Sequence, residues 1–157
     1  MKKMTLKTDK VLKAYNIISQ AKYTKLDDAD KIKVWKIARA LKPVATKYDE
    51  DTKDAAEKLK PEGFDESLRK AQEYERIAKD KDANASGLEM GAAEYGKFIG
   101  ELQKYNRLVN DAVREFADKE VELTFDALSE EAFTKLMNSN DWTMAQALAV
   151  GEIIVRE

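Results

Sequence analysis

The stretch that decides the fold runs from Asp28 to Leu59 and reads DADKIKVWKIARALKPVATKYDEDTKDAAEKL. Within it, apolar or small residues recur at alternating spacings of four and three, at Val34, Ala38, Leu41, Ala45, Tyr48, Thr52, Ala55 and Leu59. This spacing places the side chains along one side of an α-helix, as in coiled coils. We therefore expect one long helix over residues 28–59 with a continuous apolar seam.

A second stretch, within residues 92–118, carries the same rhythm, at Tyr95, Phe98, Leu102, Tyr105, Val109, Ala112 and Phe116. Two matching seams in one chain predict a coiled-coil-like antiparallel hairpin of 28–59 with 92–118, because a parallel pairing needs a long return connection. The predicted register sets Ala38 against Phe116, Tyr48 against Tyr105 and Leu59 against Tyr95. Several such pairs oppose a small residue to a large one, which fills a core without voids.

The other expected elements are short, and together they make one mainly α domain over residues 1–157. Alternating stretches at 3–7 and 121–125 predict a minor β pairing. Trp142 and Met144 are expected in the core. Shorter helices are expected after a cap at Thr8 or Asp9, over residues 64–78, after a cap at Ser129, and from a cap at Asp141 or Thr143 to Gly151.

Composition narrows the range of functions. The chain has 157 residues, with 28 Lys and Arg against 30 Asp and Glu, and a net charge of −2 predicts neither a nucleic-acid binder nor a membrane binder overall. The absence of Cys excludes disulfides and thiolate sites, and the absence of His removes the commonest general base and transition-metal ligand. We expect no metal and no cofactor. Without a signal peptide or a membrane-spanning run, a cytoplasmic protein is expected.

The first long helix is divided by charge. Residues 31–47 contain six basic residues and no acidic one, whereas residues 49–57 contain five acidic residues and one Lys. Trp35 and Ile32 point away from the seam, among the lysines. Such a tryptophan usually packs beneath a neighbouring helix, here the first one, while the lysines extend into solvent. If it is exposed, it forms a partner-binding face of Lys31, Trp35, Lys36, Arg39 and Lys42, suited to an acidic partner or to a nucleic-acid base.

Patterns for other chemistry are incomplete. Residues 80–86 begin like a calcium loop, but Ala85 stands where glycine is needed and Gly91 where the bidentate glutamate is needed, so we expect an ordinary polar turn. No phosphate-binding glycine loop is present. No two carboxylates stand out in an apolar context, so a carboxylate-dependent hydrolase is the last alternative, and we expect no enzyme.

The order of elements resembles small helical accessory proteins of tailed phages and prophages. The resemblance rests on the Met4–Lys7 start, a helix, the long hairpin, the Val121–Phe125 stretch and a short helical end. It implies an accessory role in a bacterial host, in assembly or in modulating a host machine or defence system, and assigns no catalytic residue. We therefore expect a non-enzymatic protein-interaction module, with a nucleic-acid-associated protein using residues 31–47 as the alternative. A homodimer is compatible with the charge-divided helix, which can pair head-to-tail with its copy.

Overall fold

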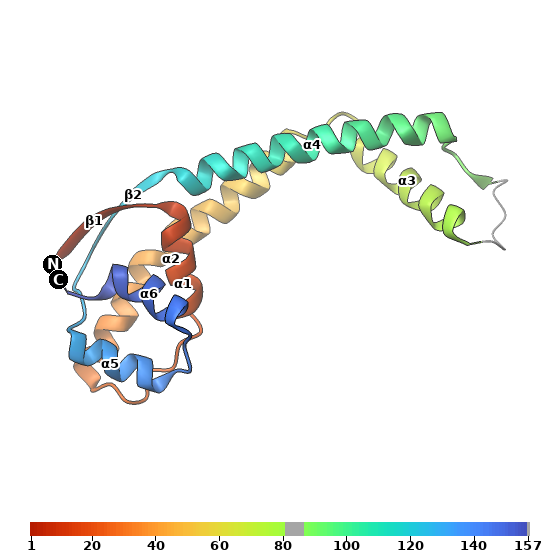
Figure 1. Cartoon of the computed structure of the whole chain (residues 1–157). Helices are drawn as coiled ribbons and strands as arrows, with labels where there is room; N and C mark the ends of the chain where they lie inside the picture. The colour runs from red at the N-terminus through yellow and green to blue at the C-terminus, as the bar shows by residue number, and fades with distance from the viewer. Residues whose placement is uncertain (81–86, 157) are drawn as a thin grey trace. The chain divides into compact units, whose positions relative to one another are not determined.

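The structure is a computed structural model that describes residues 1–80 and 87–156. Most of the expected calcium-like turn, residues 81–86, lies outside the described residues. The described residues form two strands and six helices in the order β1 (Lys2–Lys7), α1 (Thr8–Ile18), α2 (Asp28–Lys58), α3 (Phe64–Lys79), α4 (Ala92–Asp118), β2 (Glu120–Phe125), α5 (Glu130–Ser139) and α6 (Met144–Ile154) (Figure 1). The mainly α class is confirmed. Among these residues no helix is both long and apolar enough to span a bilayer.

The chain forms two compact units, which divide both long helices between them. The first unit consists of residues 1–51 and 114–157, and the second of residues 52–113. The first unit holds the larger core, to which α1, α2, β2, α5 and α6 contribute buried side chains such as Val11, Leu41 and Ile154.

The predicted β pairing is confirmed in the first unit. β1 and β2 run antiparallel, with Lys2 opposite Phe125 and Lys7 opposite Glu120. Leu123 and Phe125 are buried and alternate with exposed residues, because successive side chains of a strand point to opposite faces.

The expected cap of α1 is wrong. Thr8 is the first residue of the helix, and the preceding position is Lys7, which makes no side-chain cap. The backbone N–H and the hydroxyl of Thr8 both donate to the carbonyl of Lys119, at 2.9 and 2.7 Å. Thr8 therefore ties the start of α1 to the residue before β2.

The two last helices begin where the sequence predicts. The hydroxyl of Ser129 accepts from the N–H of Ala132 at the start of α5. Thr143 and Gln146 form a reciprocal capping box at the start of α6, with donor–acceptor distances of 3.2 and 2.9 Å. Gly151 does not end α6, which continues to Ile154. Gly151 instead allows close packing, because a Cβ there would lie 3.2 Å from the Phe133 ring.

The second unit is built around a small aromatic core. Phe64, Ala71, Met90 and Phe98 are buried there. The Phe64 ring lies 4.6 Å from the Tyr105 ring and 5.7 Å from the Phe98 ring, measured between centroids. These contacts join the start of α3 to α4.

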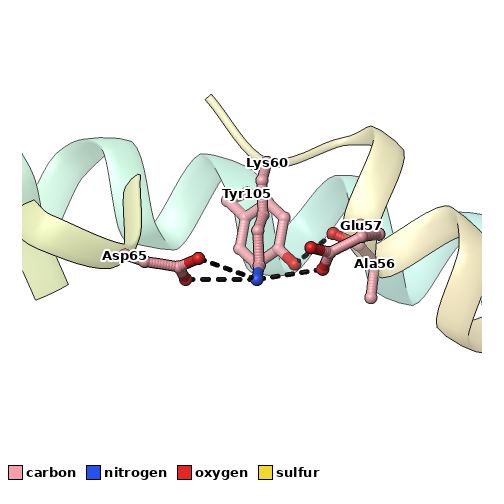
Figure 2. Close-up of polar contacts among 5 residues, drawn as sticks. All are labelled: Ala56, Glu57, Lys60, Asp65 and Tyr105. Atoms are coloured by element: carbon pink, nitrogen blue, oxygen red, sulfur yellow. Dashed lines mark hydrogen bonds and ion pairs between the residues drawn. The ribbon is translucent and has the colours of Figure 1, made fainter. Parts of the chain in front are cut away.

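A polar clasp closes the turn between α2 and α3 within this unit (Figure 2). The Lys60 ammonium lies 2.9 Å from Glu57 and 3.1 Å from Asp65, and its pKa is raised by hydrogen bonds to these two carboxylates. The Tyr105 hydroxyl donates to the carbonyl of Ala56 at 2.6 Å, as Figure 2 also shows. The turn itself uses Gly63 with a φ of 72°, a conformation that glycine adopts without strain.

The predicted register of the two seams is wrong. In the second unit Tyr105 bonds to Ala56, not to a position level with Tyr48. In the first unit Phe116 lines a cavity with Val44 and Tyr48 instead of facing Ala38. Each contact is displaced by about two helical turns, roughly one heptad. A shift of one heptad keeps the same seam positions in contact, so the spacing pattern alone does not distinguish the two registers.

Candidate partner-binding face

The first half of α2, within the first unit, has one buried side and one open side. Val34, Ile37 and Leu41 are buried in the core. At 3.6 residues per turn, the side opposite them spans an arc of about 140°. That arc carries Lys31, Ile32, Trp35, Lys36, Arg39 and Lys42, which we call the Trp35 face.

The apolar centre of the Trp35 face is open to solvent. Trp35 is 54% exposed and Ile32 is 52% exposed. The expectation that they pack beneath the first helix is therefore wrong. The reason is that α1 shares a core with the opposite side of α2, the one that carries Val34, Ile37 and Leu41. Large apolar side chains left open at adjacent positions of a helix are typical of a surface that binds another molecule.

Arg39 holds Trp35 in place. Its guanidinium carbon lies 4.7 Å from the centroid of the Trp35 ring, one helical turn along α2. Such a cation–π contact contributes about 0.5–1 kcal/mol at an exposed site. It also covers part of the ring and restricts its rotamers, so that less conformational entropy is lost when a partner binds.

The positive charges around Trp35 are uncompensated. Within residues 1–80 and 87–156, Lys31, Lys36, Arg39 and Lys42 make no ion pair with a carboxylate. By contrast Lys47, just beyond the face, lies 2.8 Å from Asp51, whose hydrogen bond raises the pKa of Lys47. The four cations of the Trp35 face are thus available to a partner, whereas Lys47 is held by Asp51.

The chemistry of the Trp35 face suits binding better than catalysis. It contains no acid, base or nucleophile other than the amines of its lysines. Trp and Arg are the residue types that most often dominate the binding energy of protein interfaces. In the part of the chain that the structure describes, no three acidic residues are grouped so that they could hold a metal ion.

The sequence predicted that the residues of the Trp35 face share one side of a helix, but its prediction for Met144 was wrong. Met144 was expected in the core and is 74% exposed. Trp142 is partly buried and its ring lies 6.3 Å from that of Phe133, measured between centroids. No signal in the sequence indicates this exposure, because α6, in which Gln146 and Glu152 are the only polar residues, has the composition of a buried helix.

No protein-family model, no curated protein and no solved structure matches the chain. The function is therefore argued from the geometry and chemistry of the Trp35 face.

Proposed function

We propose that the protein is a non-enzymatic interaction module that binds an acidic partner protein through the Trp35 face. One observation carries this proposal: a half-exposed tryptophan, held by Arg39, stands among four cations that make no ion pair within residues 1–80 and 87–156. An acidic surface with an apolar pocket complements it, since Trp35 and Ile32 would fill the pocket while the lysines meet carboxylates at the rim. The phage-like layout adds the proposal of a cytoplasmic accessory role in a bacterial host.

The test is affinity capture from a bacterial lysate treated with nuclease. The bait is the full chain, and the test variant is Trp35→Ala combined with Arg39→Glu. The matched control is Lys104→Glu, an exposed lysine of α4 that makes no ion pair within the described residues. We expect an acidic protein to be captured by the wild type and by the control, and to be lost with the test variant.

The affinity of the captured protein should then be measured with single variants. Truncating a central interface tryptophan typically costs at least about 2 kcal/mol, so Trp35→Ala should weaken binding by about 30-fold or more. Lys42→Glu, at the rim, should act mainly on the association rate and on its salt dependence. If Trp35→Ala and Lys104→Glu bind equally well, the proposed face is wrong.

The alternative is a nucleic-acid-associated protein that uses the same residues. An aromatic ring among cations is the pattern of single-strand binding surfaces, where bases stack on the ring and cations follow the backbone. Arg39 already lies over the Trp35 ring, which leaves less of it for stacking and favours the protein partner.

Salt dependence and nuclease treatment separate the two proposals. Four cations contacting phosphates of a single strand predict that log K falls with log salt at a slope of about −3. This slope is measured by fluorescence anisotropy with a labelled oligonucleotide. Capture that disappears after nuclease treatment, together with such a slope, would replace the protein partner by nucleic acid.

A further inference from the structure

The last helix, α6, is apolar on all sides. Its sequence is MAQALAVGEII, in which Gln146 and Glu152 are the only polar residues. A helix without a polar side is normally covered on all sides by other elements.

Among the residues that the structure describes, the chain itself covers only one side of α6. Val150, Ile153 and Ile154 are buried in the core of the first unit. On the opposite side Met144 is 74% exposed and Leu148, one turn further, is 57% exposed. The capping box at Thr143 fixes the start of the helix, so this open side is displayed on a well-formed element.

Met144 and Leu148, on the open side of α6, form a ridge between two hollows, and we call this ridge the crest of α6. One hollow, of about 470 Å³, lies between α5 and α6 and is lined by apolar side chains that include Phe133, Met137 and Leu148. The other, of about 260 Å³, lies between α1 and α6, and Leu148 lines it as well. Met144 and Leu148 therefore stand above an apolar surface that continues to both sides.

The two flanks of the crest carry opposite charge. Glu130 lines the hollow on the α5 side, and Lys10 and Lys13 line the hollow on the α1 side. Glu152 lies on the crest and borders both hollows. In the described parts of the chain none of these four side chains makes an ion pair. The surface thus contains a positive and a negative edge, each without a partner.

We propose that a second copy of this chain covers the open side of α6 and forms a two-fold symmetric dimer. A two-fold axis along the direction of α6 packs Met144 and Leu148 of the two copies together. It also places the lysine flank of each copy against the Glu130 flank of the other, so the complementary contact is made twice. An axis across α6 would oppose lysines to lysines and is disfavoured by charge.

This interface differs from a head-to-tail pairing of α2, and it does not rest on the proposed partner. Its residues are separate from the Trp35 face. A dimer would carry two Trp35 faces. A partner with two acidic sites would then bind the dimer more tightly than the monomer, because the second contact forms at an effective concentration set by the spacing of the two sites.

The experiment is sedimentation equilibrium of the full chain over a wide range of concentrations. We expect a monomer–dimer equilibrium. Leu148→Glu places a charge at the centre of the interface and should raise the dissociation constant by about 100-fold or more. The matched control is Leu108→Glu, at a leucine of α4 that is 43% exposed, and it should leave the constant unchanged. Circular dichroism verifies that both variants are folded, which is expected because both leucines are exposed.

Charge reversal tests the orientation of the axis. Lys13→Glu and Glu130→Lys should each raise the dissociation constant by about 10-fold, and the double variant should restore it, because the exchanged charges again face each other. A chain that is monomeric up to about 1 mM overturns the proposal. A dimer that Leu148→Glu leaves intact overturns it too, as does a double variant weaker than both single variants.

Discussion

Phe98 provides the most direct test of the second unit, because it is one of only a few buried residues in the small core described there. The Phe98 side chain is 3% exposed and belongs to a cluster with Phe64, Ala71 and Met90. Its ring lies 5.7 Å from that of Phe64 at an interplanar angle of 44°. The perturbation is Phe98→Ala, which removes the ring and leaves a cavity between α3 and α4.

The expected loss follows from the buried area and the ring contact. A buried aromatic side chain removes at least about 150 Å² from water, and its ring accounts for most of this. At about 25 cal/mol per Å² the lost ring is worth about 3 kcal/mol. The contact with Phe64 adds about 0.5–1 kcal/mol beyond area. We expect Phe98→Ala to lower the free energy of unfolding by about 3–4 kcal/mol, within the usual range for Phe→Ala in a core.

The assay combines urea denaturation with amide hydrogen exchange, because the two units can unfold separately. Hydrogen exchange shows in which of the two units the free energy of unfolding has fallen. The effect should be concentrated in amides of residues 64–79 and of α4 within the second unit. Leu108→Ala, at an exposed position of the same helix, is the control and should cost less than about 1 kcal/mol. A loss below about 1 kcal/mol for Phe98→Ala would refute the aromatic core.

Three further predictions test other elements. Trp35→Ala should change the free energy of unfolding by no more than about 1 kcal/mol in thermal denaturation, because the ring is exposed and its Arg39 contact is weak; a loss as large as that of a core variant would place the ring inside. Thr143→Ala should cost about 1 kcal/mol and speed hydrogen exchange in the first turn of α6, and unchanged exchange would argue against the capping box. The Tyr95 hydroxyl donates to Glu75, and this hydrogen bond, then burial, raises the pKa of Tyr95 above its ordinary value. Its stabilisation is therefore complete below pH of about 10 and is lost as pH rises through the raised pKa; alkaline denaturation should be shallower for Tyr95→Phe, and identical curves would contradict the contact.

The elements of this fold were predictable because each has a local signal. The spacing of apolar residues predicted α2 and α4, and alternation predicted β1 and β2. The register of the seams was not predictable, since a shift of one heptad keeps the same seam. What selects the register is a distant contact: the turn at Gly63 brings Phe64 to the Tyr105 ring, and the Tyr105 hydroxyl reaches Ala56.

For the Trp35 face, the sequence predicts which residues share one side of the helix but not whether that side is exposed. Periodicity assigned its residues to one side of α2, because the period of a helix determines which residues share a side. Exposure depends on where the neighbours lie, and the core of the first unit meets the other side of α2. The unpaired state of Lys36, Arg39 and Lys42 likewise depends on which carboxylates the fold brings near, and none in the described residues comes within ion-pair distance.

The pattern of polarity in a helix also indicates how many neighbours it needs. The first half of α2 has apolar residues on two sides, and α6 has them on all sides, yet the described chain covers one side of each. Of the large apolar residues that stay exposed in the described parts of the chain, only Leu108 belongs to the second unit. The others, which include Ile32, Trp35, Met144 and Leu148, belong to the first. Because burying such side chains is the main source of binding energy, binding should concentrate in the first unit. The two surfaces differ in their charge, since the Trp35 face is positive throughout whereas the crest of α6 carries both signs. A surface of one sign requires a partner of the opposite sign, and a surface with both signs can pair with its own copy.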